Sequence, residues 1–296
     1  MHSVSTQKIR VILAATDLSP AADLAVEQAA LLARKWNAEL CLLHVFNDSI
    51  WNSIKAIYTA ENWSDTDPVL LARNRLSKQV KTLSEQHGIR VRGETRTGEA
   101  VPMIADFVRE QQAQLLVVGE HGEDWIGDTL LGGTAVNLIE QAKIPVLLVR
   151  RVVPEDFSTI LTATDFSDNA QRAARWSSEC FPSARHILLH AYFVAFEGRL
   201  RMAGASSDDI ERFRDDELAR TEIQIIRQVA ELAPHQPQRL LMRGYPAAAL
   251  LEQSERLGAD VIVMGVHGNA ALGKRLLGSV TQNVLYHARC NVLLVP

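Results

Sequence analysis

The amino-acid sequence predicts an α/β fold made of two repeated, doubly wound domains, each with a parallel sheet that has helices on both faces. Three observations support this prediction. Several segments of the first half recur in order in the second half, short apolar runs alternate with amphipathic segments, and the 296 residues, 47% of them apolar, suffice for two domains of ordinary size. We expect the first domain over residues 1–152 and the second over 153–296.

Four pairs of segments carry the internal repeat. They are residues 12–19 and 160–167, 42–45 and 188–191, 116–122 and 262–268, and 146–149 and 292–295. The first pair is offset by 148 positions and the other three by 146, so the second copy has lost a net two residues between its first two strands. Because the period has the size of a domain, the repeat indicates a duplicated domain and not a solenoid.

The elements of the first copy follow from its apolar pattern. The segment Arg10–Ala15 is almost continuously apolar, as in a strand that is buried on both faces. Ser19 and Pro20 then supply an N-cap and a first-turn proline for a helix over Ala21–Trp36. Further along the chain we expect strands at 39–45, 90–96, 115–119 and 146–149, and helices at 69–87, 101–111 and 134–141.

The second copy repeats this order after a linker at residues 150–157. A charged helix is expected from Asp208 to about Leu232. Residues 46–68 do not fit the pattern; we expect a loop or lid that packs on the helices, with an interface or ligand-gating segment as the alternative. The strands of the second copy are expected near 159–163, 185–191, 238–242, 260–264 and 292–295.

The composition excludes several classes of protein. The net charge is −4 and no half, arm or tail is basic, so we expect no nucleic-acid partner. The apolar runs have the length of strands, so we expect no membrane span. Three cysteines without a close pair argue against a disulfide framework or a structural zinc site, and they favour a reducing cytoplasm. We assign no metal ligands, because no three or four ligand residues converge.

Two segments of each copy are expected to meet at the carboxyl edge of the sheet, where open parallel sheets bind ligands. One segment ends the first strand at Asp17 or Asp165. The other is a glycine-rich loop after the fourth strand, which in the second copy runs from Gly265 to a helix start at Ser279. The N–H groups and dipole of such a helix start favour phosphate. The aspartates are candidates for hydrogen bonds to a ligand or to the backbone of their own turn, and less so for a general base.

The loop from Gly265 to Ser279 has the pattern Gly-x2-Gly-x9-Gly-Ser. This pattern resembles the ATP-binding signature of the universal stress protein family. The strand-end aspartate, the histidine after the second strand and the closing Val-Leu-Leu-Val are also similar to that family, and the resemblance covers nearly the whole chain twice. It implies a five-stranded parallel sheet of order 3-2-1-4-5 in each domain. It also implies pairing through the last strands, which a tandem chain would make internally as a pseudo-dimer; a homodimer of chains and an unidentified protein partner stay open.

The resemblance further implies which residues bind the nucleotide. In the second copy, Asp165 and the backbone near Ala191 would face adenine and ribose, while Lys274 and Arg275 would add positive charge. His267 either contacts phosphate or braces the loop. The phosphates would lie among Gly265, Gly268, Gly278, Ser279 and Val280. The matching first-copy positions are Asp17, Val45, Gly119, Gly122, Gly132, Gly133 and Thr134.

The first copy departs from this pattern. Gly133 replaces the hydroxyl residue, and the loop has no lysine or arginine but contains Glu120, Glu123, Asp124 and Asp128. Like charges near a triphosphate are unfavourable. We therefore expect ATP or another adenine nucleotide, with or without Mg²⁺, to bind mainly to the second domain.

The predicted function is regulatory nucleotide binding in a stress response. No catalytic residue is assigned, because the sequence has no evident dedicated base, arginine finger or Mg²⁺-holding carboxylate pair, so any hydrolysis would be slow. One alternative is a weak Mg-dependent ATPase that uses Asp165. The other is an adaptor whose clefts hold a different small ligand or none.

Overall fold

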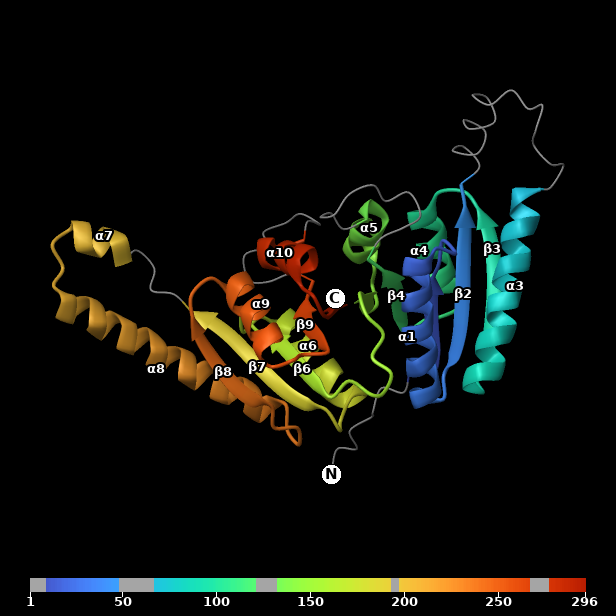
Figure 1. The fold of residues 1–296 in the computed structure, drawn as a ribbon. Helices are drawn as coiled ribbons and strands as arrows, with labels where there is room; N and C mark the ends of the chain where they lie inside the picture. The colour runs from blue at the N-terminus through green and yellow to red at the C-terminus, as the bar shows by residue number, and fades with distance from the viewer. Residues whose placement is uncertain (1–8, 48–66, 121–131, 193–196, 267–276) are drawn as a thin grey trace, which may run out of the picture. The chain divides into compact units, whose positions relative to one another are not determined.

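The computed structural model describes residues 9–47, 67–120, 132–192, 197–266 and 277–296, which belong to two compact units (Figure 1). The first unit is Met1–Asp156 together with Asn291–Leu294, and the second is Phe157–Cys290 together with Val295–Pro296. Strands and helices alternate in both units, so the predicted α/β class is confirmed. Most of the segment 46–68 lies outside the described residues.

The first unit contains a parallel sheet with the strand order β3-β2-β1-β4-β5, as the resemblance implied. Helices α1 and α3 pack together on one face, and α4 and α5 pack together on the other (Figure 1). Every boundary lies within two residues of its predicted position. The elements are β1 (Val11–Ala15), α1 (Pro20–Trp36), β2 (Glu39–Phe46), α3 (Pro68–His87), β3 (Val91–Thr97), α4 (Ala100–Glu110), β4 (Leu115–Gly119), α5 (Gly133–Gln141) and β5 (Val146–Val149).

The second unit repeats this arrangement with the parallel order β8-β7-β6-β9. It contains the short helix α7, for which the sequence analysis made no prediction. Its elements are β6 (Thr159–Ala163), α6 (Asp168–Cys180), β7 (Arg185–Tyr192), α7 (Glu197–Met202), α8 (Ser207–Glu231), β8 (Gln238–Arg243), α9 (Pro246–Arg256), β9 (Val261–Gly265) and α10 (Ser279–His287), followed by the last strand, β10 (Asn291–Val295).

Strand β10 ends the second repeat, yet its residues Asn291–Leu294 belong to the first unit. There they pair antiparallel with β5, with Leu293 opposite Leu147. Asn291 is completely buried, and its Oδ1 accepts hydrogen bonds from the backbone N–H groups of Arg150 (2.9 Å) and Arg151 (3.2 Å). This side chain therefore extends the hydrogen bonding beyond the end of β5.

Local hydrogen bonds and residue types fix both ends of helix α1. The Ser19 hydroxyl accepts a hydrogen bond from the N–H of Ala22 at 3.2 Å, and Pro20 occupies the first turn. At the other end Asn37 is left-handed with φ 50°, and its N–H bonds to the Arg34 carbonyl. Helix α6 repeats the start, because Ser167 caps the N–H of Ala170 at 3.2 Å.

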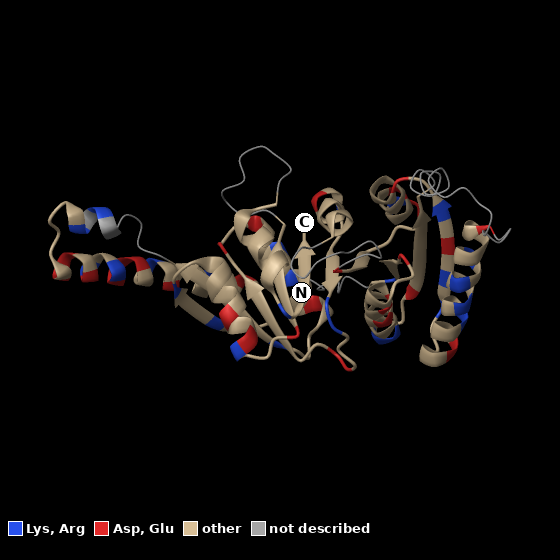
Figure 2. Cartoon of the chain, turned by 45° about the horizontal axis from the view of Figure 1, so that its top comes forward, with Lys and Arg blue, Asp and Glu red and all other residues tan. Residues whose placement is uncertain are grey.

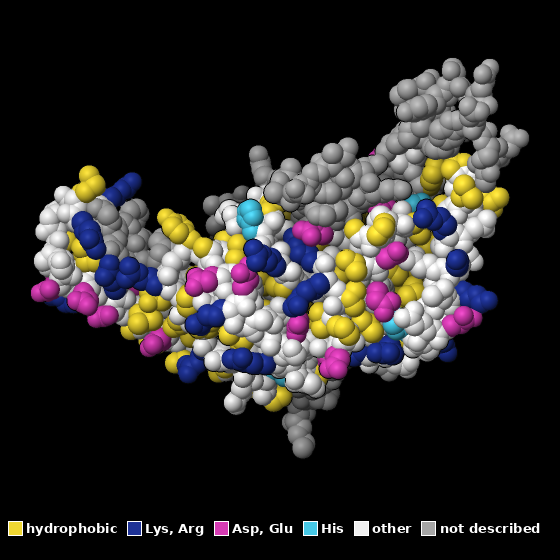
Figure 3. Space-filling view, in the orientation of Figure 1, with side chains coloured by type: hydrophobic (Ala, Val, Ile, Leu, Met, Phe, Trp, Pro, Cys, Tyr) yellow, Lys and Arg dark blue, Asp and Glu magenta, His cyan; other side chains and the backbone are white. Residues whose placement is uncertain are grey.

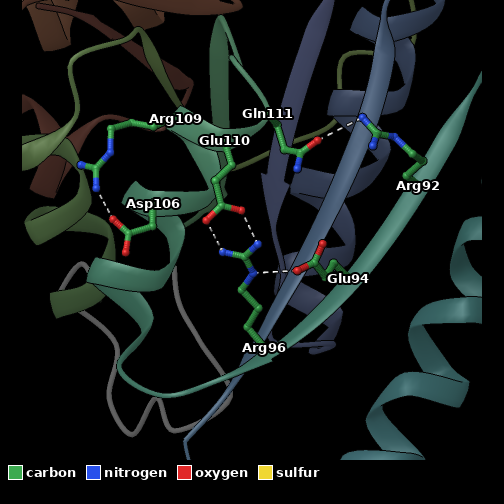
Figure 4. Close-up of polar contacts among 7 residues, drawn as sticks. All are labelled: Arg92, Glu94, Arg96, Asp106, Arg109, Glu110 and Gln111. Carbon is green, nitrogen blue, oxygen red and sulfur yellow. Dashed lines mark hydrogen bonds and ion pairs between the residues drawn. The ribbon is translucent and has the colours of Figure 1, made fainter.

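The edge strand β3 has a charged outer row that faces α4 (Figure 4). Arg96 bonds to Glu94 (2.7 Å) and Glu110, and its guanidinium lies 4.6 Å from the ring centroid of Phe107. This contact with Arg96 lowers the pKa of Glu110. Charged side chains at a sheet edge disfavour pairing with another strand, which protects this edge from strand addition.

Charged residues also line α3 and α8, which pack on the edge strands β3 and β8 (Figure 2). Both helices are amphipathic, with only a few of their residues buried. Among the helices that the structure describes, none is long and apolar enough to cross a membrane.

We predict that Asn291→Ala lowers the free energy of unfolding by about 2–4 kcal/mol. The change leaves the N–H groups of Arg150 and Arg151 without their acceptor, and each buried unsatisfied group costs about 1–3 kcal/mol. Urea unfolding measures the effect. Asn283→Ala, at an exposed position of α10, is the matched control and should change stability by less than about 0.5 kcal/mol. Equal effects of the two changes would contradict the role of Asn291.

Candidate functional site

A hydrogen-bonded turn follows β1 at the carboxyl edge of the first sheet. The Thr16 hydroxyl accepts from the N–H of Leu18, and Oδ1 of Asp17 accepts from the N–H of Ser19, both at 3.0 Å. Leu18 has φ 66°, an uncommon conformation for a residue with a branched side chain. The turn therefore directs the Asp17 carboxylate to the strand end and leads Ser19 into its cap.

The second copy contains the same turn after β6. The Thr164 hydroxyl accepts from the N–H of Phe166, and Oδ1 of Asp165 accepts from the N–H of Ser167, again both at 3.0 Å. Phe166 has φ 64°. Each aspartate thus bonds to the backbone of its own turn, one of the two hydrogen-bonding roles considered from the sequence.

A histidine from the next strand secures each turn. Nδ1 of His44 lies 3.0 Å from the Thr16 carbonyl oxygen, and Nδ1 of His190 lies 2.8 Å from that of Thr164. A carbonyl oxygen only accepts, so Nδ1 carries the proton and donates. The His190 ring also stacks on Phe166, with 4.2 Å between centroids. The ends of the first two strands of each copy are therefore joined through this histidine.

Burial lowers the pKa of His190, while its bond to the Thr164 carbonyl and the charges of Asp165 and Glu217 oppose that shift. The fold therefore favours the neutral ring, which can still donate from Nδ1 to Thr164.

The glycines at the ends of β4 and β9 allow the helices to approach closely. A Cβ built on Gly265 would lie 2.9 Å from Cβ and 3.0 Å from the carbonyl carbon of Asn169, at the start of α6. A Cβ on Gly119 would lie 3.3 Å from the Ala21 carbonyl oxygen. These two glycines were predicted for their approach to a ligand. The structure gives them a packing role, because they bring the strand end against the helix start.

The starts of α5 and α10, where the sequence analysis expected a phosphate to bind, lack side-chain caps among the described residues. The N-cap residues Gly132 and Gly278 have no side chain that could cap the helix, and no other side-chain cap is present within the described residues. A Cβ on Gly133 would meet nothing within 4 Å, and one on Gly278 would meet only the Thr281 hydroxyl, at 3.9 Å. The dipole at both helix starts favours an anion.

The remaining predicted residues are distributed as follows. Thr134 and Val280 follow these helix starts in the first turn. Val45 and Ala191 lie near the ends of β2 and β7, and Ala191 is buried. Four second-copy residues and one first-copy residue lie outside the described residues, namely His267, Gly268, Lys274, Arg275 and Gly122.

Sequence reasoning missed an ion pair at this edge of the first copy. Arg150, directly after β5, bonds to Oε1 of Glu120, directly after β4, at 2.8 Å, and its side chain is only 6% exposed. The carbonyl of Glu120 also accepts from the N–H of Gly132, the N-cap of α5. Because β4 and β5 are neighbours, the register of the sheet could have indicated this pair.

This pair corrects the charge balance expected for the first copy. Glu120 was counted among four acids without a basic partner, whereas Arg150 neutralises it. The matching residues of the second copy are Val266 and Pro296, so no ion pair forms there. Val266 is buried, and its N–H donates to the Val295 carbonyl at 3.0 Å.

Metal ligation finds no support in the part of the chain that the structure describes, where no three His, Cys, Asp or Glu side chains converge. The three cysteines, Cys41, Cys180 and Cys290, are all buried.

We predict that Gly265→Ala destabilises the protein by about 1–3 kcal/mol, because the new methyl group would overlap the backbone of α6 near Asn169. Thermal and urea unfolding measure this loss. Gly133→Ala is the control: its Cβ meets nothing, and alanine favours a helix over glycine by up to about 1 kcal/mol. A stable Gly265→Ala variant would refute the close packing at β9.

We predict that His190 contributes to the loss of stability in mild acid. The unfolded chain binds its proton first, so the free energy of unfolding falls as the pH drops below the ordinary histidine pKa of about 6.5. In His190→Asn, whose amide can replace the donor to Thr164, the fall between pH 7.5 and pH 5.5 should be smaller. Urea titrations at both pH values measure it. An unchanged fall would show that His190 titrates normally in the fold.

Comparison with known proteins assigns the chain to a family. The family model described as "Universal stress protein family" matches residues 8–150 and again 156–296. A universal stress protein of Mycolicibacterium smegmatis is 26% identical over 96% of both chains, and one of Thermus aquaticus is 36% identical over 47% of this chain and 98% of its own. The crystal structure of a universal stress protein from Archaeoglobus fulgidus shares the fold, with a TM-score of 0.68 at 18% identity over 96% of this chain and 97% of its own. The chain therefore belongs to the universal stress protein family and contains two of its domains in tandem.

Proposed function

We propose that this protein binds an adenine nucleotide, with ATP as the first candidate, at the carboxyl edge of the second repeat, and that it acts as a regulatory binding protein. One observation carries the proposal. The start of α6, which directly follows the Asp165 turn, packs against the end of β9 at Gly265, at the edge where parallel sheets bind ligands. The start of α10 follows β9 in the chain and offers backbone N–H groups to a phosphate.

The residues present fit such a ligand. A carboxylate has several acceptor sites, so Asp165 can hold its turn through Oδ1 and also accept from a ribose hydroxyl or an adenine amino group. Bound ATP would supply a triphosphate and an associated Mg²⁺ ion. Lys274 and Arg275, in the loop before α10, would add positive charge.

The contrast between the two copies supports the second repeat as the main site. Beside the start of α5, the first copy has a buried ion pair between Glu120 and Arg150, and its loop sequence adds Glu123, Asp124 and Asp128. At the matching strand ends the second copy has the uncharged Val266 and Pro296. A triphosphate would therefore meet less electrostatic repulsion in the second copy. Fewer charged side chains there are already engaged in an ion pair.

We also propose an internal pseudo-dimer of the two repeats. The antiparallel pairing of β10 with β5 supports it, because the last strand of the second repeat pairs with that of the first. A homodimer of chains or a protein partner could transmit the regulatory effect in a stress response. The three buried thiols suit a reducing compartment, which supports a cytoplasmic location.

Calorimetric titration of ATP with Mg²⁺ into the full-length protein tests the proposal, with about one site per chain expected. Ser279→Asp, at the exposed first residue of α10, should weaken ATP binding by about tenfold, since it places a negative charge at the phosphate seat. An acid at a helix start also favours the helix, so this variant should fold.

The matched control is Gly133→Asp, at the equivalent exposed residue of α5, which should leave ATP binding unchanged. Loss of binding in Gly133→Asp alone would move the site to the first repeat. A folded wild-type protein that gives no heat with ATP would exclude the nucleotide function and favour the adaptor alternative.

A further inference from the structure

The two repeats differ in the layer between their first two long helices and the sheet. In the second repeat this layer is an apolar cluster of Ala174, Leu188, Ile225 and Leu232, against which Phe166 packs. Helices α6 and α8 both contribute residues to this cluster.

In the first repeat the same layer is mixed, because three of the matched positions carry polar residues. The duplication matches Phe166 with Leu18, Ile225 with Gln79 and Leu232 with Gln86. Leu241, which also packs on the second-repeat cluster, is matched by Thr95.

A groove of about 450 Å³ lies between α1 and α3. This volume falls within the range of small-molecule sites, about 300–1,000 Å³. One wall carries the carboxylates Asp23 and Glu27, one turn apart on α1, and the other carries Arg75 and Lys78 on α3. Acidic and basic side chains lie near one another over these helices in Figure 3.

The opposite charges of the two walls do not neutralise each other. In the part of the chain that the structure describes, neither Arg75 nor Lys78 forms an ion pair with Asp23 or Glu27. Asp23 instead accepts a hydrogen bond from Nε2 of Gln79 at 2.7 Å. The groove therefore presents a negative wall facing a positive wall.

Buried polar atoms around the groove lack hydrogen bonds. His87 is 8% exposed; its Nε2 lies 3.1 Å from Glu27, while its Nδ1 has no partner among the described residues. The same holds for Oε1 of Gln79 and for Oγ1 of Thr95. Buried polar atoms without a hydrogen bond are uncommon in folded proteins, so we expect these atoms to have a hydrogen-bond partner. At the positions of Gln79 and Thr95 the second repeat has the apolar residues Ile225 and Leu241, although Oε1 of Gln171 and Nε2 of Gln228 lack a partner there among the described residues.

We propose that this groove binds a free α-amino acid, with its ammonium group at Asp23 and Glu27 and its carboxylate at Arg75 and Lys78. A zwitterion is the small ligand that satisfies both walls at once, because a simple anion or cation would meet one wall of like charge. The site lies in the first repeat and does not depend on nucleotide binding in the second.

The test is a panel of the 20 free amino acids, added at millimolar concentration to the full-length protein in thermal-shift and calorimetric titrations. At least one amino acid should raise the unfolding midpoint and bind saturably. Lys78→Ala should weaken that binding by about tenfold, as expected for loss of a charge-assisted contact. Lys81→Ala, on the same helix but paired with Glu85 outside the groove, is the matched control and should leave the affinity unchanged.

A second variant separates binding from folding. Gln79→Ile combined with Gln86→Leu installs the residues of the second repeat and removes two polar side chains from the groove, so it should weaken amino-acid binding and raise the unfolding midpoint of the ligand-free protein. ATP binding should not change. The proposal is overturned if no amino acid binds the wild-type protein, if Lys78→Ala and Lys81→Ala behave alike, or if the double variant binds the amino acid as tightly as the wild type.

Discussion

The turn after the first strand of each copy is the constraint on which both the helix packing and the candidate site depend. Threonine and aspartate side chains accept backbone N–H groups within the turn, and a histidine from the next strand donates to the threonine carbonyl. These bonds hold Leu18 and Phe166 at positive φ, a conformation that costs about 1–2 kcal/mol. The helix starts at this turn, so the turn also decides how closely α1 and α6 approach the strands that end in glycine.

The turn is the same in both copies, whereas the residues around it differ. The same hydrogen bonds appear in both copies, yet the neighbouring layer is apolar around Ile225 and polar around Gln79. The strand ends beside the phosphate seat also differ, because Glu120 and Arg150 form a buried ion pair where the second copy has Val266 and Pro296. The two repeats therefore share a scaffold but present different side chains at these positions.

Much of the candidate site could be predicted because its parts are local. The capping serines, the strand-end aspartates and the glycines before α5 and α10 are encoded by neighbours in the chain, and the repeat showed which of them recur. Gly119 and Gly265 have a packing role that the sequence analysis did not predict. A glycine pattern indicates a close approach, but whether a ligand or a helix approaches depends on the packing of α1 and α6.

The sequence by itself determined the duplication, the α/β class and the order and bounds of nearly every described strand and helix, because apolar periodicity and capping residues act over a few positions. Only the tertiary structure decided which distant residues meet. The pair of Glu120 and Arg150 spans 30 positions, and Asn291 bonds to Arg150 across 141. The groove between α1 and α3 likewise depends on side chains that meet only after the sheet has formed. Such contacts arise from strand order and register, which local patterns do not encode.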